Sequence, residues 1–169
     1  MTEDQLKLEY ALLLAIWERV DLTMTYGDQM TNIFDVAQCI LAKNNFRMAT
    51  MQVHRLCFMA QCYAYHTYGR MLYPETHYMG RTAPICSELD KLHRGKYLMP
   101  NLNDHAKPIV GEDKQIVDCV LERFKNDTGK DMARYCIDLG IATGKFEMPF
   151  VERTITNAQI KTISDTIFN

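Results

Sequence analysis

The stretch Thr50–Gly69 reads TMQVHRLCFMAQCYAYHTYG and carries the clearest helical pattern in the chain. Its apolar side chains recur at the three- and four-residue spacing of one helix face, at Val53, Leu56, Met59, Ala60 and Tyr63. Thr50 is placed to cap the amino-terminal end, and Gly69 suits the left-handed conformation that often follows a helix. The pattern therefore predicts a long helix from Thr50 to Tyr68.

Similar patterns on both sides of this stretch predict further helices. Before it, Thr31 or Asn32 caps a helix that ends near Lys43 and buries Ile33, Val36, Ala37, Ile40 and Leu41. After it, we expect an extended piece at Met71–Tyr73 and a loop at Gly95–Glu112, with helices over Ile85–Arg94 (opened by Pro84), Asp113–Lys125, Lys130–Leu139 and Asn157–Phe168. No segment shows sustained period-two alternation. The expected fold class is mainly α: a compact single-domain helical bundle with irregular connecting segments and at most a minor β element.

Residues Glu3–Val20 predict an additional helix that is apolar on more than one side. Leu6, Leu13, Leu14 and Trp17 share one face, and further apolar residues widen it. The apolar surface of such a helix has to be buried, either against its own domain or against another protein chain. We therefore divide the chain into an amino-terminal helical appendage, residues 1–30, and a main domain, residues 31–169.

Composition excludes several classes of protein. The chain has 169 residues with 19 Lys and Arg against 21 Asp and Glu, a formal net charge of −2. This balance argues against a protein that holds nucleic acid mainly by neutralising phosphates. The longest wholly apolar run, Tyr10–Trp17, is far shorter than the roughly 20 residues of a membrane span. The amino terminus is acidic where a secretory signal is basic, so we expect a cytoplasmic protein without membrane contact.

Cysteines and histidines give no strong metal or catalytic motif. The chain has 6 Cys and no CxxC, and free buried thiols are the expected state. His54, Cys57, Cys62 and His66 share the long helix, but the first pair lies on a different sector from the second, so the four do not converge. No phosphate-binding glycine loop, HExxH or GxSxG is present. We therefore expect no metal and no cofactor.

Five tyrosines lie close together in the sequence, at Tyr63, Tyr65, Tyr68, Tyr73 and Tyr78. They fit two interpretations. One is core and boundary packing with the hydroxyls reaching water, and the other is an aromatic surface for protein contact.

The order of these elements resembles the SocA-like family, also called the Panacea antitoxin domain, which is found in phage-associated proteins. The resemblance covers roughly residues 31–168. Its strongest pieces are Phe34-Asp35-Val36-Ala37, Arg55-Leu56, Ala60-Gln61 and Tyr68-Gly69-Arg70. Where the family has Gly-Pro, this chain has Ala83-Pro84, and Tyr78 stands for the family tryptophan just upstream.

This resemblance implies protein binding rather than catalysis. Family members are antitoxins that neutralise a partnered toxin by direct contact, and one is an adaptor that delivers its toxin to a ClpXP-type protease. An appendage such as Glu3–Val20 can set the choice of toxin. We therefore expect an antitoxin or phage-encoded inhibitor whose partner is a toxin, a protease-adaptor target or a host defence protein.

The residues expected to bind that partner come from both parts of the chain. They are Leu13, Leu14, Trp17, Arg55, Arg70, Tyr78 and Pro84. Two alternatives stay open: a homo-oligomeric structural or adaptor protein, and a metal- or thiol-dependent enzyme.

Overall fold

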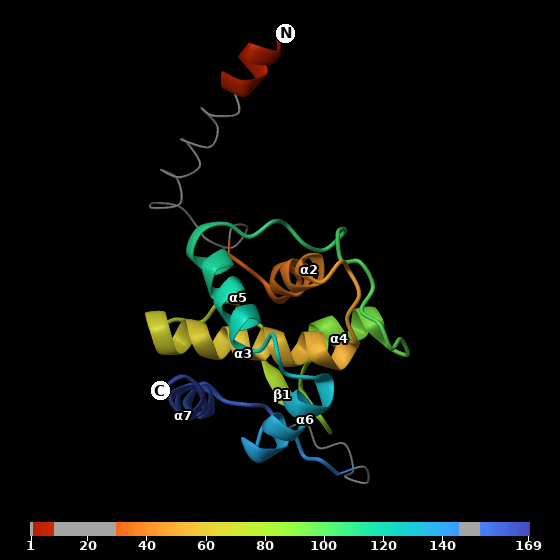
Figure 1. Ribbon diagram of the computed structural model, residues 1–169, viewed down its shortest axis with the longest axis vertical. Helices are drawn as coiled ribbons and strands as arrows, with labels where there is room; N and C mark the ends of the chain where they lie inside the picture. Colours follow the sequence, from red (N-terminus) through yellow and green to blue (C-terminus); the bar gives the residue numbers. More distant parts are fainter. Residues whose placement is uncertain (1, 9–29, 146–152) are drawn as a thin grey trace. The chain divides into compact units, whose positions relative to one another are not determined.

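The computed structural model describes residues 2–8, 30–145 and 153–169 (Figure 1). The chain divides into two units, residues 1–30 and residues 31–169. In the first unit, residues 3–8 are helical, and the Thr2 hydroxyl accepts a hydrogen bond from the Gln5 backbone at 3.2 Å. This turn agrees with the start of the predicted helix Glu3–Val20. The remainder of that prediction, with Leu13, Leu14 and Trp17, lies outside the described residues.

In the second unit, helix α3 (Thr50–Tyr68) lies at the centre (Figure 1). In the figure, α2 (Ile33–Lys43) and α5 (Gly111–Arg123) lie on one side of it, and α6 (Gly129–Asp138) and α7 (Asn157–Phe168) lie on the other. These neighbours bury every residue of α3 from Val53 to Cys62. The predicted apolar stripe is therefore only part of the buried surface of α3. The predicted mainly α fold is confirmed.

Side-chain caps fix the start of three helices. Asn32 and Asp35 form a capping box at α2, in which each side chain accepts a hydrogen bond from the other residue's backbone N–H. Thr128 caps α6 in the same way, and Thr156 caps α7, as predicted. The predicted Thr50 cap of α3 is wrong. Thr50 is the first helical residue, and its backbone N–H donates to the Tyr97 carbonyl at 2.8 Å.

A small antiparallel sheet replaces the start of one predicted helix. Strand β1 (His77–Met79) pairs with β2 (Pro84–Cys86), with Tyr78 opposite Ile85. The prediction that Pro84 opens a helix is therefore wrong, and α4 begins at Ser87 and ends at His93. Gly80 makes the tight connection possible, because a Cβ atom there would lie 2.6 Å from the Ala83 carbonyl oxygen. The chain thus turns back on itself before α4 starts.

The predicted extended piece at Met71–Tyr73 does not pair as a strand. Instead, the buried Gln61 side chain of α3 takes the place of a neighbouring strand. Its Oε1 accepts from the backbone N–H of Leu72 at 2.6 Å, and its Nε2 donates to the Tyr73 carbonyl at 2.8 Å. None of the helices in the described ranges combines the length and apolar character that a bilayer crossing requires.

Candidate functional site

The structure does not gather the predicted partner-binding residues of the main domain on one surface. Arg55 is 6% exposed, and its guanidinium donates to the Thr82 and Gly129 carbonyl oxygens at 2.8 and 3.3 Å. Pro84 is buried in β2, and Tyr78 is half-buried in β1. The hydrogen bonds of Arg55 join α3 to the segment before β2 and to the start of α6.

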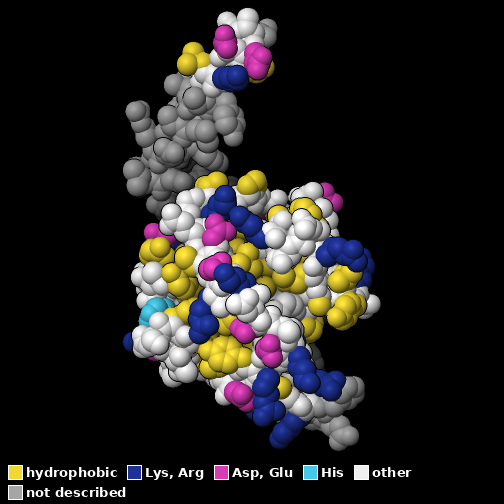
Figure 2. Space-filling view, in the orientation of Figure 1, with side chains coloured by type: hydrophobic (Ala, Val, Ile, Leu, Met, Phe, Trp, Pro, Cys, Tyr) yellow, Lys and Arg dark blue, Asp and Glu magenta, His cyan; other side chains and the backbone are white. Residues whose placement is uncertain are grey.

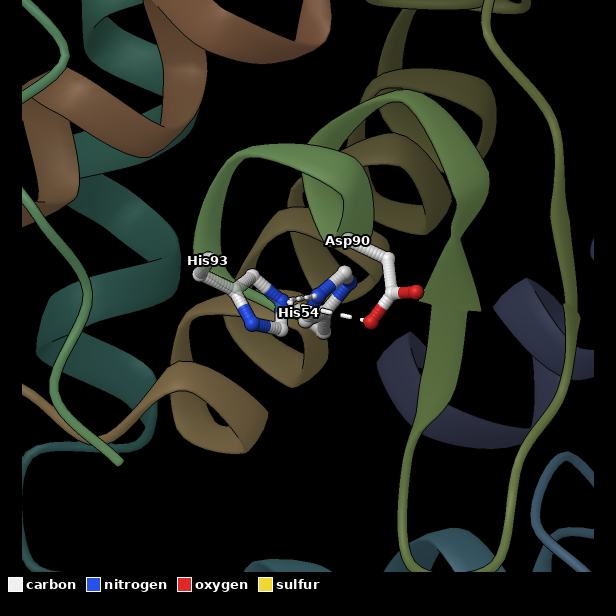
Figure 3. Close-up of side chains that lie close together, drawn as sticks. All are labelled: His54, Asp90 and His93. Carbon is white, nitrogen blue, oxygen red and sulfur yellow. Dashed lines mark hydrogen bonds and ion pairs between the residues drawn. The ribbon is translucent and has the colours of Figure 1, made fainter. Parts of the chain in front are cut away.

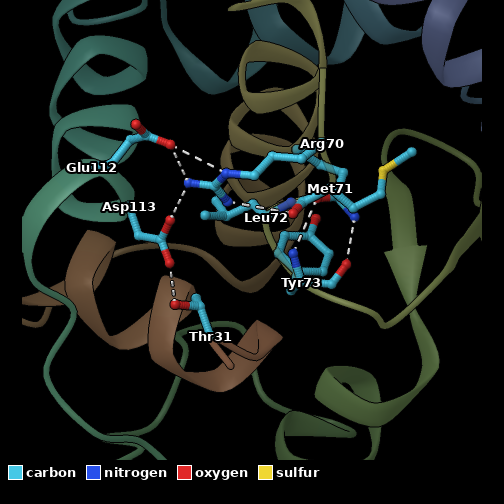
Figure 4. A network of polar contacts seen from close by, with 8 residues as sticks. Thr31, Arg70, Met71, Leu72, Tyr73, Glu112 and Asp113 are labelled. Carbon is cyan, nitrogen blue, oxygen red and sulfur yellow. Dashed lines mark hydrogen bonds and ion pairs between the residues drawn. The ribbon is translucent and has the colours of Figure 1, made fainter. Parts of the chain in front are cut away.

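Arg70 is half-exposed and forms a polar network with the start of α5 (Figure 4). Its Nη2 lies 2.7 Å from Glu112 Oε1 and 2.6 Å from Asp113 Oδ1. Asp113 also accepts a hydrogen bond from the Thr31 hydroxyl, which precedes α2. These bonds raise the pKa of Arg70, although its burial acts in the opposite direction. The network joins the end of α3 to α5 and to the start of α2.

A histidine cluster, defined here as His54, His93 and Asp90, lies between α3 and α4 (Figure 3). His54 Nε2 is 2.7 Å from His93 Nε2, and Asp90 Oδ1 is 3.7 Å from the same His93 atom. Both imidazoles are buried. Burial lowers the pKa of His54 well below its ordinary value, and nearby His77 and His93 add to this effect. Burial also lowers the pKa of His93, against the opposing influence of Asp90.

The backbone of Cys86 determines which proton His54 carries. The Cys86 N–H donates to His54 Nδ1 at 3.1 Å, so neutral His54 holds its proton on Nε2 and donates it to His93. A histidine that binds a metal ion through Nε2 keeps its proton on Nδ1 instead. The three side chains have metal-binding chemistry, but this tautomer suits a hydrogen-bonded support for the junction of β2 and α4.

A second buried histidine, His77 of β1, contacts the start of β2. His77 Nδ1 donates to the Pro84 carbonyl at 2.9 Å, and His77 Nε2 lies 2.7 Å from the Tyr73 hydroxyl. That hydroxyl also lies 2.8 Å from the Cys57 carbonyl oxygen, so its single proton serves two acceptors. Burial lowers the pKa of His77 to about 4.

The cysteines and tyrosines singled out in the sequence are spread over the fold. All six cysteines are free, and burial raises the pKa of Cys62, Cys86 and Cys136 to about 12. His66 does not join His54, because it lies 3.5 Å from Asp165 of α7. Tyr73 is buried, whereas Tyr68 is exposed, so the five tyrosines do not share one environment.

An apolar groove that sequence reasoning did not find lies beside α2. The α2 groove, of about 360 Å³, is defined by Asp35, Gln38, Cys39, Ala42, Lys43, Phe46, Asn103, Ala106, Lys107, Pro108, Ile109 and Lys114. One wall is a face of α2, and the opposite wall is the segment 103–109. Figure 2 shows one face of the molecule, on which apolar side chains are interspersed with charged ones.

Phe46 holds an unusual backbone conformation at this groove. It has φ 57° and follows Asn45 at φ 56°, so two consecutive residues are left-handed. This conformation costs a non-glycine residue about 1–2 kcal/mol, and it is least suited to a bulky one. Nevertheless, 46% of Phe46 is exposed to solvent. The fold thus keeps a large aromatic residue at a strained surface position where glycine would be easier to accommodate.

A second cleft, of about 400 Å³, lies between α2, α3 and α5 and differs in chemistry. Four of its five charged residues pair with one another: Lys43 lies 3.4 Å from Asp118, and Lys125 lies 2.5 Å from Glu122. Mutual neutralisation leaves this cleft without a dominant charge. The α2 groove, with its apolar walls, is the stronger candidate site.

Searches of protein-family models, of curated proteins and of solved structures found no match to this chain. The similarity to the SocA-like family therefore stays a prediction from the residues quoted above.

Proposed function

We propose that this protein acts in the cytoplasm by binding another protein through the α2 groove, as an antitoxin or inhibitor that neutralises its partner by direct contact. The observation that carries the proposal is the exposed, left-handed Phe46 at an apolar groove. Strained residues are kept where function requires them, and buried aromatic side chains dominate the energetics of many protein interfaces. The antitoxin role itself is supported by the resemblance of residues 31–168 to the SocA-like family.

The internal polar residues support this choice of surface indirectly. Arg55, His54 and His77 all form hydrogen bonds with other residues of the same domain. By contrast, Phe46 and Ile109 leave apolar surface in the α2 groove. A partner that covers the groove would remove this surface from water, which is the main favourable term in most protein association.

The test is capture of a partner by the full chain, tagged at its carboxyl terminus, followed by a binding measurement with the purified partner. A Phe46→Ser, Ile109→Ser double variant should bind at least about tenfold more weakly, because anchor truncation commonly costs 2 kcal/mol or more. Tyr97→Ser is the matched control, since Tyr97 is 80% exposed and lies outside the groove. A purified partner that binds the double variant as tightly as wild type would overturn the assignment of the groove.

The same experiment addresses the other expectations. A variant lacking residues 1–30 that folds but loses the partner would support a role for the appendage in partner choice. If the wild-type chain captures no protein and forms a defined homo-oligomer in solution, self-assembly replaces partner inhibition as the favoured function.

A further inference from the structure

The walls of the α2 groove are fixed before any partner arrives. Gln38 of α2 donates to Asn101 and Asn103 at 3.0 and 2.6 Å and accepts from the Leu102 backbone at 2.9 Å. Asp35, one turn earlier, accepts from the Lys107 backbone N–H at 2.8 Å. These bonds hold the segment 101–107 against α2. A partner therefore meets a preformed groove and does not have to order its walls.

The exposed charges of the groove are all positive. They are Lys43 at the end of α2, Lys107 on the opposite wall and Lys114 in α5. The one carboxylate of the groove belongs to Asp35, whose side chain is 1% exposed and already holds the Lys107 ammonium at 3.2 Å and two backbone N–H groups. Lys43 also lies 3.4 Å from Asp118 outside the groove, but both side chains are half-exposed, and water screens such a pair strongly. Three lysines against one buried carboxylate therefore leave the lining of the groove positive, although the whole chain has a formal net charge of −2.

Apolar walls and a lysine rim require a ligand with both properties. A helix with an apolar face can insert anchor side chains between Phe46 and Ile109, as in other helix-in-groove complexes. Carboxylates on its flanks would then meet the lysines, since electrostatic complementarity sets orientation and speeds association. A nucleic acid would satisfy the lysines but not the apolar walls.

We propose that the partner enters the α2 groove with a short amphipathic helix whose polar side is acidic. This inference rests on the proposed function and specifies its binding mode. Lys43 and Lys114 attract the carboxylates on the polar side of the helix. Its apolar side contacts Phe46, Ala106 and Ile109. Lys107 also neutralises the buried Asp35, so its contribution is structural as well as electrostatic.

The test uses two labelled synthetic 18-residue peptides with identical leucine positions, one with glutamate and one with lysine on the polar face. Binding to the full chain is followed by fluorescence anisotropy at low and physiological salt. The glutamate peptide should bind at least about tenfold more tightly than the lysine peptide, and salt should reduce this difference. If the lysine peptide binds equally well, or if neither peptide binds, the acidic-helix proposal is overturned.

Charge reversal provides the specific control. Lys43→Glu together with Lys114→Glu should invert the preference between the peptides. Lys107 is left intact because a carboxylate beside the buried Asp35 would destabilise the fold, whereas Asp118, which lies 3.4 Å from Lys43, is half-exposed and tolerates one. Lys91→Glu together with Lys161→Glu makes the same change in net charge at exposed residues outside the groove and should leave the preference unchanged. An effect as large from this control pair would mean that net charge, and not the groove, attracts the peptide.

Two further measurements separate this inference from the proposed function. A labelled DNA duplex that binds more tightly than the glutamate peptide, with the Phe46→Ser change having no effect, would replace the acidic helix by nucleic acid. If a purified protein partner depends on Phe46 but not on Lys43 and Lys114, the protein-binding function stands and the acidic-helix mode fails.

Discussion

Two regions of the molecule differ in how they place polar and apolar residues: the interior around β2 buries polar side chains, and the α2 groove exposes apolar ones. In the interior, His54, His77 and Arg55 are buried, and each donates or accepts hydrogen bonds within the domain. At the groove, Phe46 is strained and half-exposed, and the lysines on the rim face solvent. The difference supports a structural role for the interior residues, and it is the basis of our proposal that the groove residues contact a partner.

The largest effect should come from removing the imidazole of His54. His54→Ala leaves the Cys86 N–H without its acceptor, deprives His93 of a hydrogen bond and opens a cavity in the core. We expect the free energy of unfolding to fall by about 4 kcal/mol, measured by urea denaturation. His105→Ala, at an exposed histidine, is the control and should change it by no more than about 0.5 kcal/mol. Equal effects of the two changes would contradict a structural role for His54.

Acidification should destabilise the interior selectively. Burial lowers the pKa of His77 from its ordinary value of 6.5 to about 4 in the folded protein, so the unfolded chain binds the proton first as pH falls. The stability that neutral His77 provides is therefore complete above pH 6.5 and is lost progressively towards pH 4, by up to about 3 kcal/mol. Unfolding curves across this window measure the loss. His77→Gln should be less stable at pH 7.5 and show a shallower decline, and a slope identical to wild type would argue against His77 as the source.

The shared proton of Tyr73 predicts a smaller loss. Tyr73→Phe keeps the ring but leaves the buried His77 Nε2 without a donor and removes the hydroxyl's hydrogen bond to the Cys57 carbonyl. The free energy of unfolding should fall by about 2 kcal/mol, as it does for other buried groups left unsatisfied. Thermal melts of this variant are best compared with Tyr97→Phe, an exposed hydroxyl whose removal should cost nothing measurable. A Tyr73→Phe protein as stable as wild type would mean that the buried hydroxyl is dispensable.

Substitutions at Phe46 should have the smallest effect on stability. The Gly variant should be more stable than the Ala variant, whereas at a core position the Ala variant is normally the more stable of the two. Phe46→Gly loses a half-buried ring but relieves the left-handed backbone, so its stability should stay within about 1 kcal/mol of wild type. Phe46→Ala loses the ring and keeps most of the strain, and it should be less stable than Phe46→Gly by about 1 kcal/mol. Chemical denaturation of both variants measures the difference, and an Ala variant more stable than the Gly variant would remove the argument from strain.

Local signals in the sequence predicted most of the helices well. Asn32 and Thr156 cap their helices through their own side chains, and a cap of this kind acts over only three residues. The predicted helix Asn157–Phe168 therefore matches α7 at both ends. The apolar periodicity of the stretch Thr50–Gly69 likewise identified α3, and Gly69 ends it with φ 68° as expected.

The errors lie where distant residues decide the structure. Pro84 looked like the first residue of a helix, but pairing of β2 with β1 and the His77 bond to its carbonyl hold it extended. Arg55 looked like a surface contact, and only the packing of Thr82 and Gly129 around it shows that it is buried. The His54–His93 pair joins residues 39 positions apart, which no local spacing reveals.

The α2 groove was missed for a related reason. Its walls come from α2, the segment 103–109 and α5, and no single stretch contains a recognisable binding motif. The exposed Phe46 with its positive φ lies three residues after the end of α2 at Lys43, and composition does not indicate this conformation. Lys43, Lys107 and Lys114 likewise come together only because the fold brings α2, the segment 103–109 and α5 side by side.

The most direct test of the central claim is a joint measurement of stability and binding for Phe46→Gly. With the glutamate peptide or a purified partner as ligand, we expect an unfolding free energy within about 1 kcal/mol of wild type and binding weakened at least about tenfold. A variant that binds as tightly as wild type, or that unfolds several kcal/mol more easily, would show instead that Phe46 serves the fold and that the α2 groove is not the site.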